Sequence, residues 1–74
     1  MKKYRVSVVI EKDENGYFAF CPELQGCYTQ GGSYEEVIKN IKDAICLHIK
    51  DRLEKQEEIP SFHHISLTML EVSL

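Results

Sequence analysis

The fold of this chain is decided by residues 16–41, which read GYFAFCPELQGCYTQGGSYEEVIKNI. Aromatic side chains dominate residues 17–21 and favour a short strand, which Pro22 ends because proline has no N–H to donate to a ladder. The turn PELQG then leads to residues 27–30, which are long enough for another short strand. Gly31 and Gly32 follow and are expected to form the flexible connection to a helix. The stretch therefore predicts two short strands followed by a helix.

The helix is predicted to begin after Ser33. Ser33 followed three residues later by Glu36 is the signature of a capping box, in which the two side chains satisfy backbone N–H groups at the helix N-terminus. Apolar side chains then recur at the spacing of a helix face that packs on a sheet. This stripe comprises Tyr34, Val37, Ile38, Ile41, Ala44, Ile45, His48 and Ile49. The helical pattern fades over residues 54–61, where Pro60 prevents continuation.

Residues 4–11, YRVSVVIE, alternate between apolar and polar side chains, which predicts a half-buried strand. Its apolar face comprises Tyr4, Val6, Val8 and Ile10. Asn15-Gly16 is a strong hairpin signal, so this strand is expected to pair antiparallel with residues 17–21. Val9 makes the outward face partly apolar. The companions of Val9 on that face are, by alternation, either Phe18 and Phe20 or Tyr17 and Cys21.

Residues 63–74, HHISLTMLEVSL, are rich in apolar and β-branched residues and predict a last strand. The predicted element order is therefore β-β-β-α-β. The fold class is α+β, with a three- to four-stranded, mostly antiparallel sheet covered on one face by one helix. Because one helix covers only one face, apolar residues on the other face predict a homo-oligomer, either a dimer or a tetramer.

The composition limits the chain to a small set of functions. Its 74 residues allow a single domain, 1–74, whose folding buries only about 60% of the unfolded surface. The net charge of −3 disfavours binding to a phosphate backbone and suits a basic protein partner. No apolar run approaches the ~20 residues of a membrane span, so no membrane association is expected. Three cysteines, an odd number, disfavour a disulfide framework and predict a reducing, cytoplasmic compartment.

A series of motif residues runs through residues 3–49 in order and without gaps. The series comprises Asp13, Gly16, Tyr17, Ala19, Pro22, Leu24, Gly26, Cys27, Gly31, Glu35, Glu36, Asn40, Ala44 and Ile45. In these residues the chain resembles the HicB antitoxin family. The family pattern is D-x-x-G-Y-x-A-x-x-P-x-L-x-G-C, then a glycine, then a helix start T-x-E-E-A-x-x-N. Ser33 stands here for the usual threonine and Val37 for the usual alanine, which leaves the cap and the buried stripe intact.

The resemblance implies a degenerate RNase H-like domain that acts as the antitoxin of a toxin–antitoxin pair. Its partner would be a HicA-type toxin, a small basic ribonuclease with a double-stranded-RNA-binding-like fold that cleaves mRNA using a histidine. The antitoxin would block that site. Members of the family usually carry an additional C-terminal DNA-binding domain. This sequence stops after the predicted last strand, so we expect no appended DNA-binding domain and no DNA binding by this chain alone.

Residue type and position suggest six residues for contact with such a partner. They are Glu11, Asp13, Glu14, Tyr17, Glu23 and Tyr28. The four acidic residues are expected to form a rim that pairs with Lys and Arg of a basic toxin, since such charges steer association and set specificity. For Glu23 the alternative is a solvated turn residue. Phe18 and Phe20 are further aromatic candidates wherever they are not part of the core.

Other chemistries fit the sequence less well. The four acidic residues do not alternate along one strand face, as a two-metal nuclease site requires, so no enzymatic activity is expected. Five residues separate Cys21 from Cys27, and His63 adjoins His64, which does not suit a zinc site. We therefore expect no metal and no cofactor. A competing function is an oligomeric binding or regulatory scaffold without a toxin partner.

Overall fold

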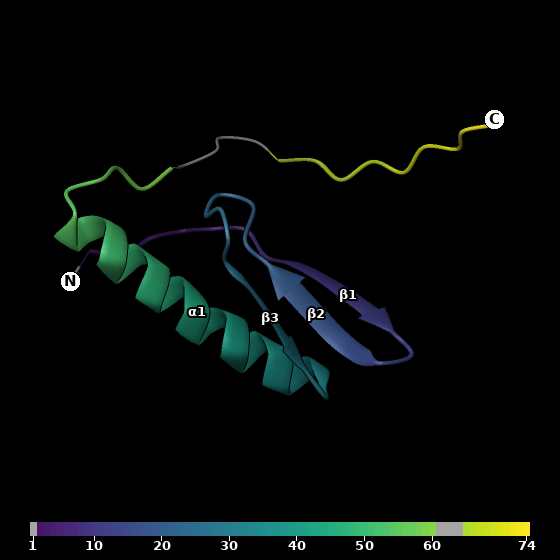
Figure 1. Ribbon diagram of the computed structural model, residues 1–74, viewed down its shortest axis with the longest axis horizontal. Helices are drawn as coiled ribbons and strands as arrows, with labels where there is room; N and C mark the ends of the chain where they lie inside the picture. Colours follow the sequence, from purple (N-terminus) through teal and green to yellow (C-terminus); the bar gives the residue numbers. More distant parts are fainter. Residues whose placement is uncertain (1, 61–64) are drawn as a thin grey trace.

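The computed structural model describes residues 2–60 and 65–74. Its elements are β1 (Val9–Asp13), β2 (Gly16–Phe20), β3 (Tyr28–Gly31) and α1 (Tyr34–Glu54). The strands form a three-stranded antiparallel sheet in the order β1-β2-β3, and α1 packs across one face of it against β2 and β3 (Figure 1). The predicted α+β class, with one helix on one face of the sheet, is confirmed.

A tight hairpin joins β1 to β2, as the Asn15-Gly16 pair predicts, but its two turn residues are Glu14 and Asn15, and Gly16 opens β2 opposite Asp13. The Asn15 N–H donates to the Asp13 carboxylate at 2.8 Å and so braces the turn. Gly16 follows with a φ of +133°, a conformation that residues with a side chain rarely adopt. A Cβ atom there would also lie 3.0 Å from the Gly31 carbonyl oxygen across the sheet. The turn therefore requires glycine for two separate reasons.

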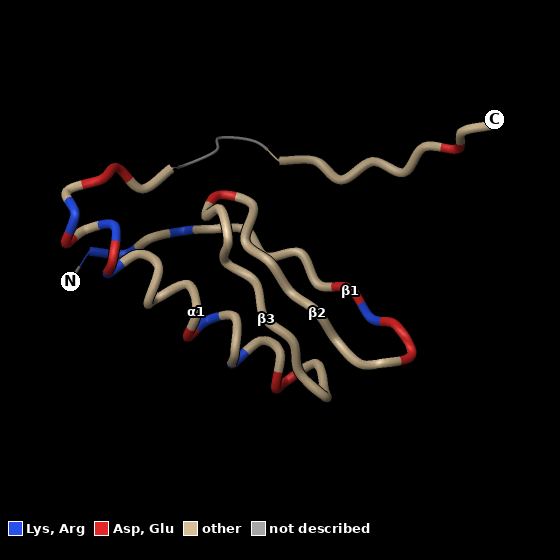
Figure 2. The backbone as a smooth tube through the Cα atoms, viewed as in Figure 1, with Lys and Arg blue, Asp and Glu red and all other residues tan. Residues whose placement is uncertain are grey.

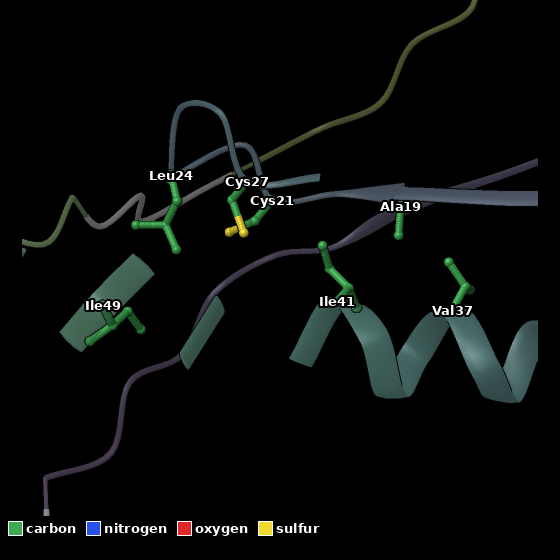
Figure 3. Packing of buried hydrophobic residues seen from close by; sticks show 7 residues of the cluster. All are labelled: Ala19, Cys21, Leu24, Cys27, Val37, Ile41 and Ile49. Atoms are coloured by element: carbon green, nitrogen blue, oxygen red, sulfur yellow. The ribbon is translucent and has the colours of Figure 1, made fainter. Parts of the chain in front are cut away.

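The register of the ladder decides which side chains share a face. Ile10, Ala19 and Thr29 are paired across the three strands and lie on one face. Ala19 is only 1% exposed and points toward α1, so this is the covered face (Figure 3). The opposite face carries Val9, Glu11, Phe18, Phe20, Tyr28 and Gln30. The sequence left two sets as possible companions of Val9, either Phe18 and Phe20 or Tyr17 and Cys21. The register shows that Phe18 and Phe20 share the face of Val9.

The core lies between the covered face and α1, and it extends into the loop after β2 (Figure 3). Its buried members are Ala19, Cys21, Leu24, Cys27, Val37, Ile41 and Ile49. Within the loop, the Cys21 N–H donates to the Cys27 carbonyl at 3.0 Å and the Leu24 N–H to the Cys21 carbonyl at 3.1 Å. These bonds fold the loop back over α1, so that Leu24 becomes a core residue. Burial raises the pKa of both the Cys21 and the Cys27 thiol.

The helix begins as the capping signature predicts. The Ser33 hydroxyl accepts a hydrogen bond from the Glu36 N–H at 3.1 Å. The Glu36 carboxylate accepts a hydrogen bond from the Gly32 N–H at 3.1 Å. In a standard capping box it would accept from the N–H of the cap residue itself, here Ser33. Within the predicted stripe Val37, Ile41 and Ile49 are buried, Ala44, Ile45 and His48 are half-buried, and Tyr34 and Ile38 are exposed. Among the described residues, no helix is long and apolar enough to span a membrane.

The first strand is shorter than the sequence predicts. The ladder begins at Val9, although the four apolar side chains of the predicted inner face still pack against the core. The reason is that β2 ends at Phe20, where the chain turns away into the loop. Residues 4–8 therefore have no neighbouring strand among the described residues.

The predicted last strand is wrong for the residues that the structure describes. Residues 65–74 belong to no helix or strand, and no backbone hydrogen bond joins them to another described residue. His63 and His64, which the prediction included, lie outside the described residues. A strand is stable only when a neighbour satisfies its N–H and C=O groups, and residues 65–74 have no such neighbour in the described part of this chain. The observed order is thus β-β-β-α.

Replacing Gly31 by alanine is expected to destabilise the fold by about 1–3 kcal/mol. A Cβ atom at Gly31 would lie 2.9 Å from the Val37 nitrogen and 3.1 Å from the Val37 Cα, so β3 and α1 would have to move apart. Gly32→Ala is the matched control, because nothing lies within 4 Å of a Cβ atom at that position. Urea denaturation followed by circular dichroism measures both free energies of unfolding. Equal stability of the two variants would contradict this account of the β3–α1 contact.

Candidate functional site

The uncovered face of the sheet is the surface that the fold leaves for contact with a partner. We call it the open face, and it consists of Val9, Glu11, Asp13, Phe18, Phe20, Tyr28 and Gln30. α1 packs on the other side of the sheet, and no described helix or strand packs on this side (Figure 1). The side chains of the open face are therefore accessible to another molecule.

Three aromatic rings lie together on the open face. Phe20 stands between Val9 and Tyr28 in one row across the strands, and Phe18 occupies the next row. Facing side chains of adjacent strands lie about 5 Å apart and the next row about 7 Å away, within reach of aromatic rings. Phe18 and Phe20 are each 40% exposed and Tyr28 is 74% exposed. A continuous exposed aromatic surface of this kind is typical of a protein-binding site.

Three carboxylates flank the rings at the hairpin end of the sheet. Glu11 and Asp13 lie on the open face and Glu14 in the adjoining turn, and Figure 2 shows this end of the hairpin as acidic apart from Lys12. Lys12 belongs to the covered face, where its ammonium lies 5.5 Å from the centre of the Tyr17 ring. Within the described residues, neither Glu11 nor Glu14 forms a salt bridge. Their charges are therefore available to a partner.

Tyr17 does not belong to the open face, although the sequence grouped it with the acidic residues. It lies half-buried on the covered face, and its ring packs edge-on against Tyr34 of α1, with centroids 6.4 Å apart and planes at 78°. Its contacts are thus with the helix. Four of the six predicted contact residues belong to the open face and its turn: Glu11, Asp13, Glu14 and Tyr28, with Tyr28 at the end of the face opposite the turn.

Glu23 is buried, so the exposed acidic rim predicted from the sequence does not include it. Its side chain is 6% exposed and accepts a hydrogen bond from the Ser7 N–H at 2.9 Å. The Cys21 thiol lies 3.7 Å from the other carboxylate oxygen and acts as a weak donor to it. A buried carboxylate without partners is costly, which explains why both oxygens are engaged. Glu23 therefore ties residues 4–8 to the loop after β2, in place of the ladder that this segment lacks.

The sequence named Phe18 and Phe20 only as further candidates and missed that they form the centre of the open face. The necessary signal was nevertheless present. A hairpin with a two-residue loop pairs odd-numbered residues of its first strand with even-numbered residues of its second, whichever two residues form the loop. Val9 therefore shares its face with both phenylalanines.

The described residues, 2–60 and 65–74, contain no group of three or more His, Cys, Asp or Glu side chains arranged to hold a metal ion. The carboxylates of β1 and its turn instead border the aromatic rings. Aromatic rings exclude water from the centre of an interface, while charges at its edge select a partner of opposite charge. The arrangement is suited to binding a basic protein surface.

Comparisons with known proteins agree with one another. A family model described as HicB_like antitoxin of bacterial toxin-antitoxin system matches residues 6–72. The chain is 62% identical over 52 residues to a UPF0150 protein of Helicobacter pylori strain J99. This alignment covers 70% of this chain and 71% of that protein. It is 36% identical over 69 residues to a UPF0150 protein of Archaeoglobus fulgidus, covering 92% of this chain and 94% of that protein. No solved structure matches the chain significantly.

Replacing Glu23 by alanine is expected to lower the free energy of unfolding by about 1–3 kcal/mol, because the Ser7 N–H loses its acceptor. Glu23→Gln should cost less, since the amide oxygen can still accept from Ser7. Gln25→Ala, at an exposed position in the same loop, is the matched control. Denaturant titration gives the stabilities, and amide exchange at Ser7 reports the bond itself. An alanine variant as stable as the control, with Ser7 exchange unchanged, would contradict the anchoring role.

Proposed function

We propose that this chain, which belongs to the HicB-like antitoxin family of bacterial toxin–antitoxin systems, binds a small basic HicA-type ribonuclease toxin and inhibits it by covering its active site. Family membership supports an antitoxin role, and the finer assignment of the toxin and of the contact surface is our proposal. The observation that carries it is the open face, where exposed aromatic rings lie beside carboxylates without an ion-pair partner in the described chain.

The chemistry of the partner explains why such a face would inhibit it. A ribonuclease must hold the phosphates of its substrate, so the surface around its active site is rich in Lys and Arg. Glu11, Asp13 and Glu14 present carboxylates that replace those phosphates and guide the two proteins together. Phe20 and Tyr28 then supply the apolar contact that excludes water and keeps the complex together.

The size of the face supports a larger assembly. Three strands of four or five residues, about 4.8 Å apart, present a flat area on the order of 240 Å² at most. A stable interface buries about 800 Å² on each partner, so the contact must extend beyond the strands. We therefore include the turn that carries Glu14 and a homo-oligomer, either a dimer or a tetramer, in the proposal. Residues 1–74 act in it as a single binding domain that supplies no catalytic group.

An oligomeric binding scaffold without a toxin is the second candidate function. The exposed apolar side chains of residues 65–74 favour it, because they suit self-association whether or not a toxin exists. The two candidates differ in whether the open face meets a toxin.

Co-expression with a HicA-type toxin, preferably one encoded beside this chain, is expected to give a complex that co-elutes in size-exclusion chromatography and no longer cleaves mRNA. Phe20→Ala should raise the dissociation constant at least about 10-fold, because it removes the central ring of the open face. Leu47→Ala is the matched control, since Leu47 is 68% exposed on α1, away from that face. Absence of a complex together with undiminished cleavage would favour the scaffold instead.

Reversing two charges, in the double variant Glu11→Lys with Glu14→Lys, is expected to slow association with the toxin about 10-fold at low salt. The difference from the unaltered chain should shrink as salt rises, because exposed charges are screened. Asp43→Lys with Glu54→Lys makes the same change of charge at exposed positions of α1 and should have a smaller effect. Stopped-flow association rates measure the difference. Equal slowing by both double variants would show that net charge, rather than the open face, guides the encounter.

A further inference from the structure

Residues 65–74 form an apolar segment that makes almost no contact with the rest of the molecule. Leu67 and Leu70 are each 83% exposed, and Met69 is 92% exposed. The segment runs apart from the sheet and the helix (Figure 1). Soluble monomers rarely leave a run of large apolar side chains in water, because burying them is the main favourable term in folding. The segment therefore has the composition of a buried element without being one in the isolated chain.

The sequence of this segment is that of a strand with two apolar faces. Ile65, Leu67 and Met69 alternate with polar Ser66 and Thr68. After Met69 the alternation changes phase, and the apolar residues become Leu70, Val72 and Leu74. In an extended strand the two sets point to opposite sides. Such a strand fits a sheet that needs apolar cover on both of its faces.

The free edge of β1 is a position of that kind. β1 is an edge strand, and α1 packs on β2 and β3 without covering it. On one face of the edge Ile10 is only half-buried, and on the other Val9 borders the exposed Phe20. The backbone continues along residues 4–8, where Ser7 donates its N–H to Glu23 and the described chain provides no ladder. An additional strand here would satisfy backbone groups and cover side chains at once.

The edge and the segment also match in length and leave room for pairing. Residues 4–13 and residues 65–74 are equally long, and an extended segment of ten residues spans about 33 Å. At the start of the edge a groove of about 960 Å³ is lined by residues 2–7 and 57–60 together with Glu23, Leu53 and Ile65, so the first residue of the segment borders the groove of its own copy while the rest of the segment runs away from it. The groove gives an incoming strand access to the backbone of residues 4–8.

We propose that two copies of this chain exchange residues 65–74, each copy adding this segment as a strand to the free edge beside β1 of the other. The chain contains both a segment with the alternation of a strand, residues 65–74, and an edge strand, β1, without an outer partner among the described residues. In the isolated chain no described backbone hydrogen bond joins the segment to this edge. Reciprocal exchange between two copies is a self-complementary, two-fold arrangement that fills both edges and leaves neither segment exposed. The exchange does not require a toxin, because it pairs backbone groups at the β1 edge; the added strand would lie beside Val9 and Glu11, at the border of the open face.

The first test is the oligomeric state of the full chain, measured by size-exclusion chromatography with light scattering over a range of concentrations. The unaltered chain is expected to be a dimer at micromolar concentration. Leu67→Asp with Met69→Asp should raise its dissociation constant at least about 100-fold, since two charges enter an apolar face. Ser66→Asp with Thr68→Asp adds the same charges at the polar positions of the same segment and should change it less than 10-fold. A monomeric unaltered chain, or equal effects of the two double variants, would overturn the exchange.

Folding of the variants can be checked separately, because residues 65–74 make no described backbone bond to the core. The circular dichroism of α1 should therefore be the same in all of them. A double variant that loses its helical signal would be replaced by Leu67→Ser with Met69→Ser, which removes the apolar side chains without adding charge.

The second test distinguishes exchange between copies from pairing within one copy. Isotope-labelled and unlabelled chains are unfolded, mixed and refolded, and filtered NMR experiments then detect only contacts between different copies. We expect such contacts between the methyl groups of Leu67 or Met69 and those of Val8 or Ile10. Contacts found only within a copy, or found only after a toxin is added, would overturn the proposal. Neither test requires a toxin, so failure of inhibition leaves the exchange untouched. A monomeric unaltered chain would also remove the homo-oligomer from the proposed function, whereas co-elution with a toxin and loss of mRNA cleavage would still test inhibition separately.

Discussion

A single helix is too narrow to cover a three-stranded sheet, and the rest of this molecule follows from that limit. An α-helix with its side chains is about 10 Å wide, whereas neighbouring strands lie about 4.8 Å apart, so one helix covers about two strands. α1 accordingly packs on β2 and β3 and leaves β1 without a helix. The loop that carries Leu24 completes the core. One face of the sheet remains uncovered, and the outer edges of β1 and β3 have no partner strand among the described residues. The open face and the β1 edge are the surfaces on which the two proposals rest.

The sequence predicted the parts of the fold that depend on neighbours along the chain. The hairpin between β1 and β2 and the helix cap at Ser33 are short-range features, and both are found, although the turn comprises Glu14 and Asn15 and not Asn15 and Gly16. Glu23 was misassigned because its burial depends on the N–H of Ser7, sixteen positions away, which no local pattern reveals. The last strand was misassigned for a related reason. Alternation shows that residues 65–74 can form a strand, but not whether the described chain contains a neighbour for it.

The toxin contact and the strand exchange that we propose use different parts of one sheet. A strand added at an edge lies in the plane of the sheet, so it leaves the open face accessible. The aromatic rings and carboxylates of that face would remain available on both copies of a dimer. In such a dimer the neighbouring copy would also enlarge the surface that a partner can contact, which would compensate for the small area of three short strands. Self-association and partner binding can thus operate together in a chain of this size.

The exposed, extended form of residues 65–74 also bears on how long the protein survives. Proteases cleave most readily in chain segments that are exposed and not held by hydrogen bonds. An isolated copy presents such a segment, whereas a copy that has exchanged strands holds it within a ladder. Cleavage would then fall mainly on isolated copies, which are most numerous when the protein is dilute. The half-life of the protein would therefore increase with its own concentration.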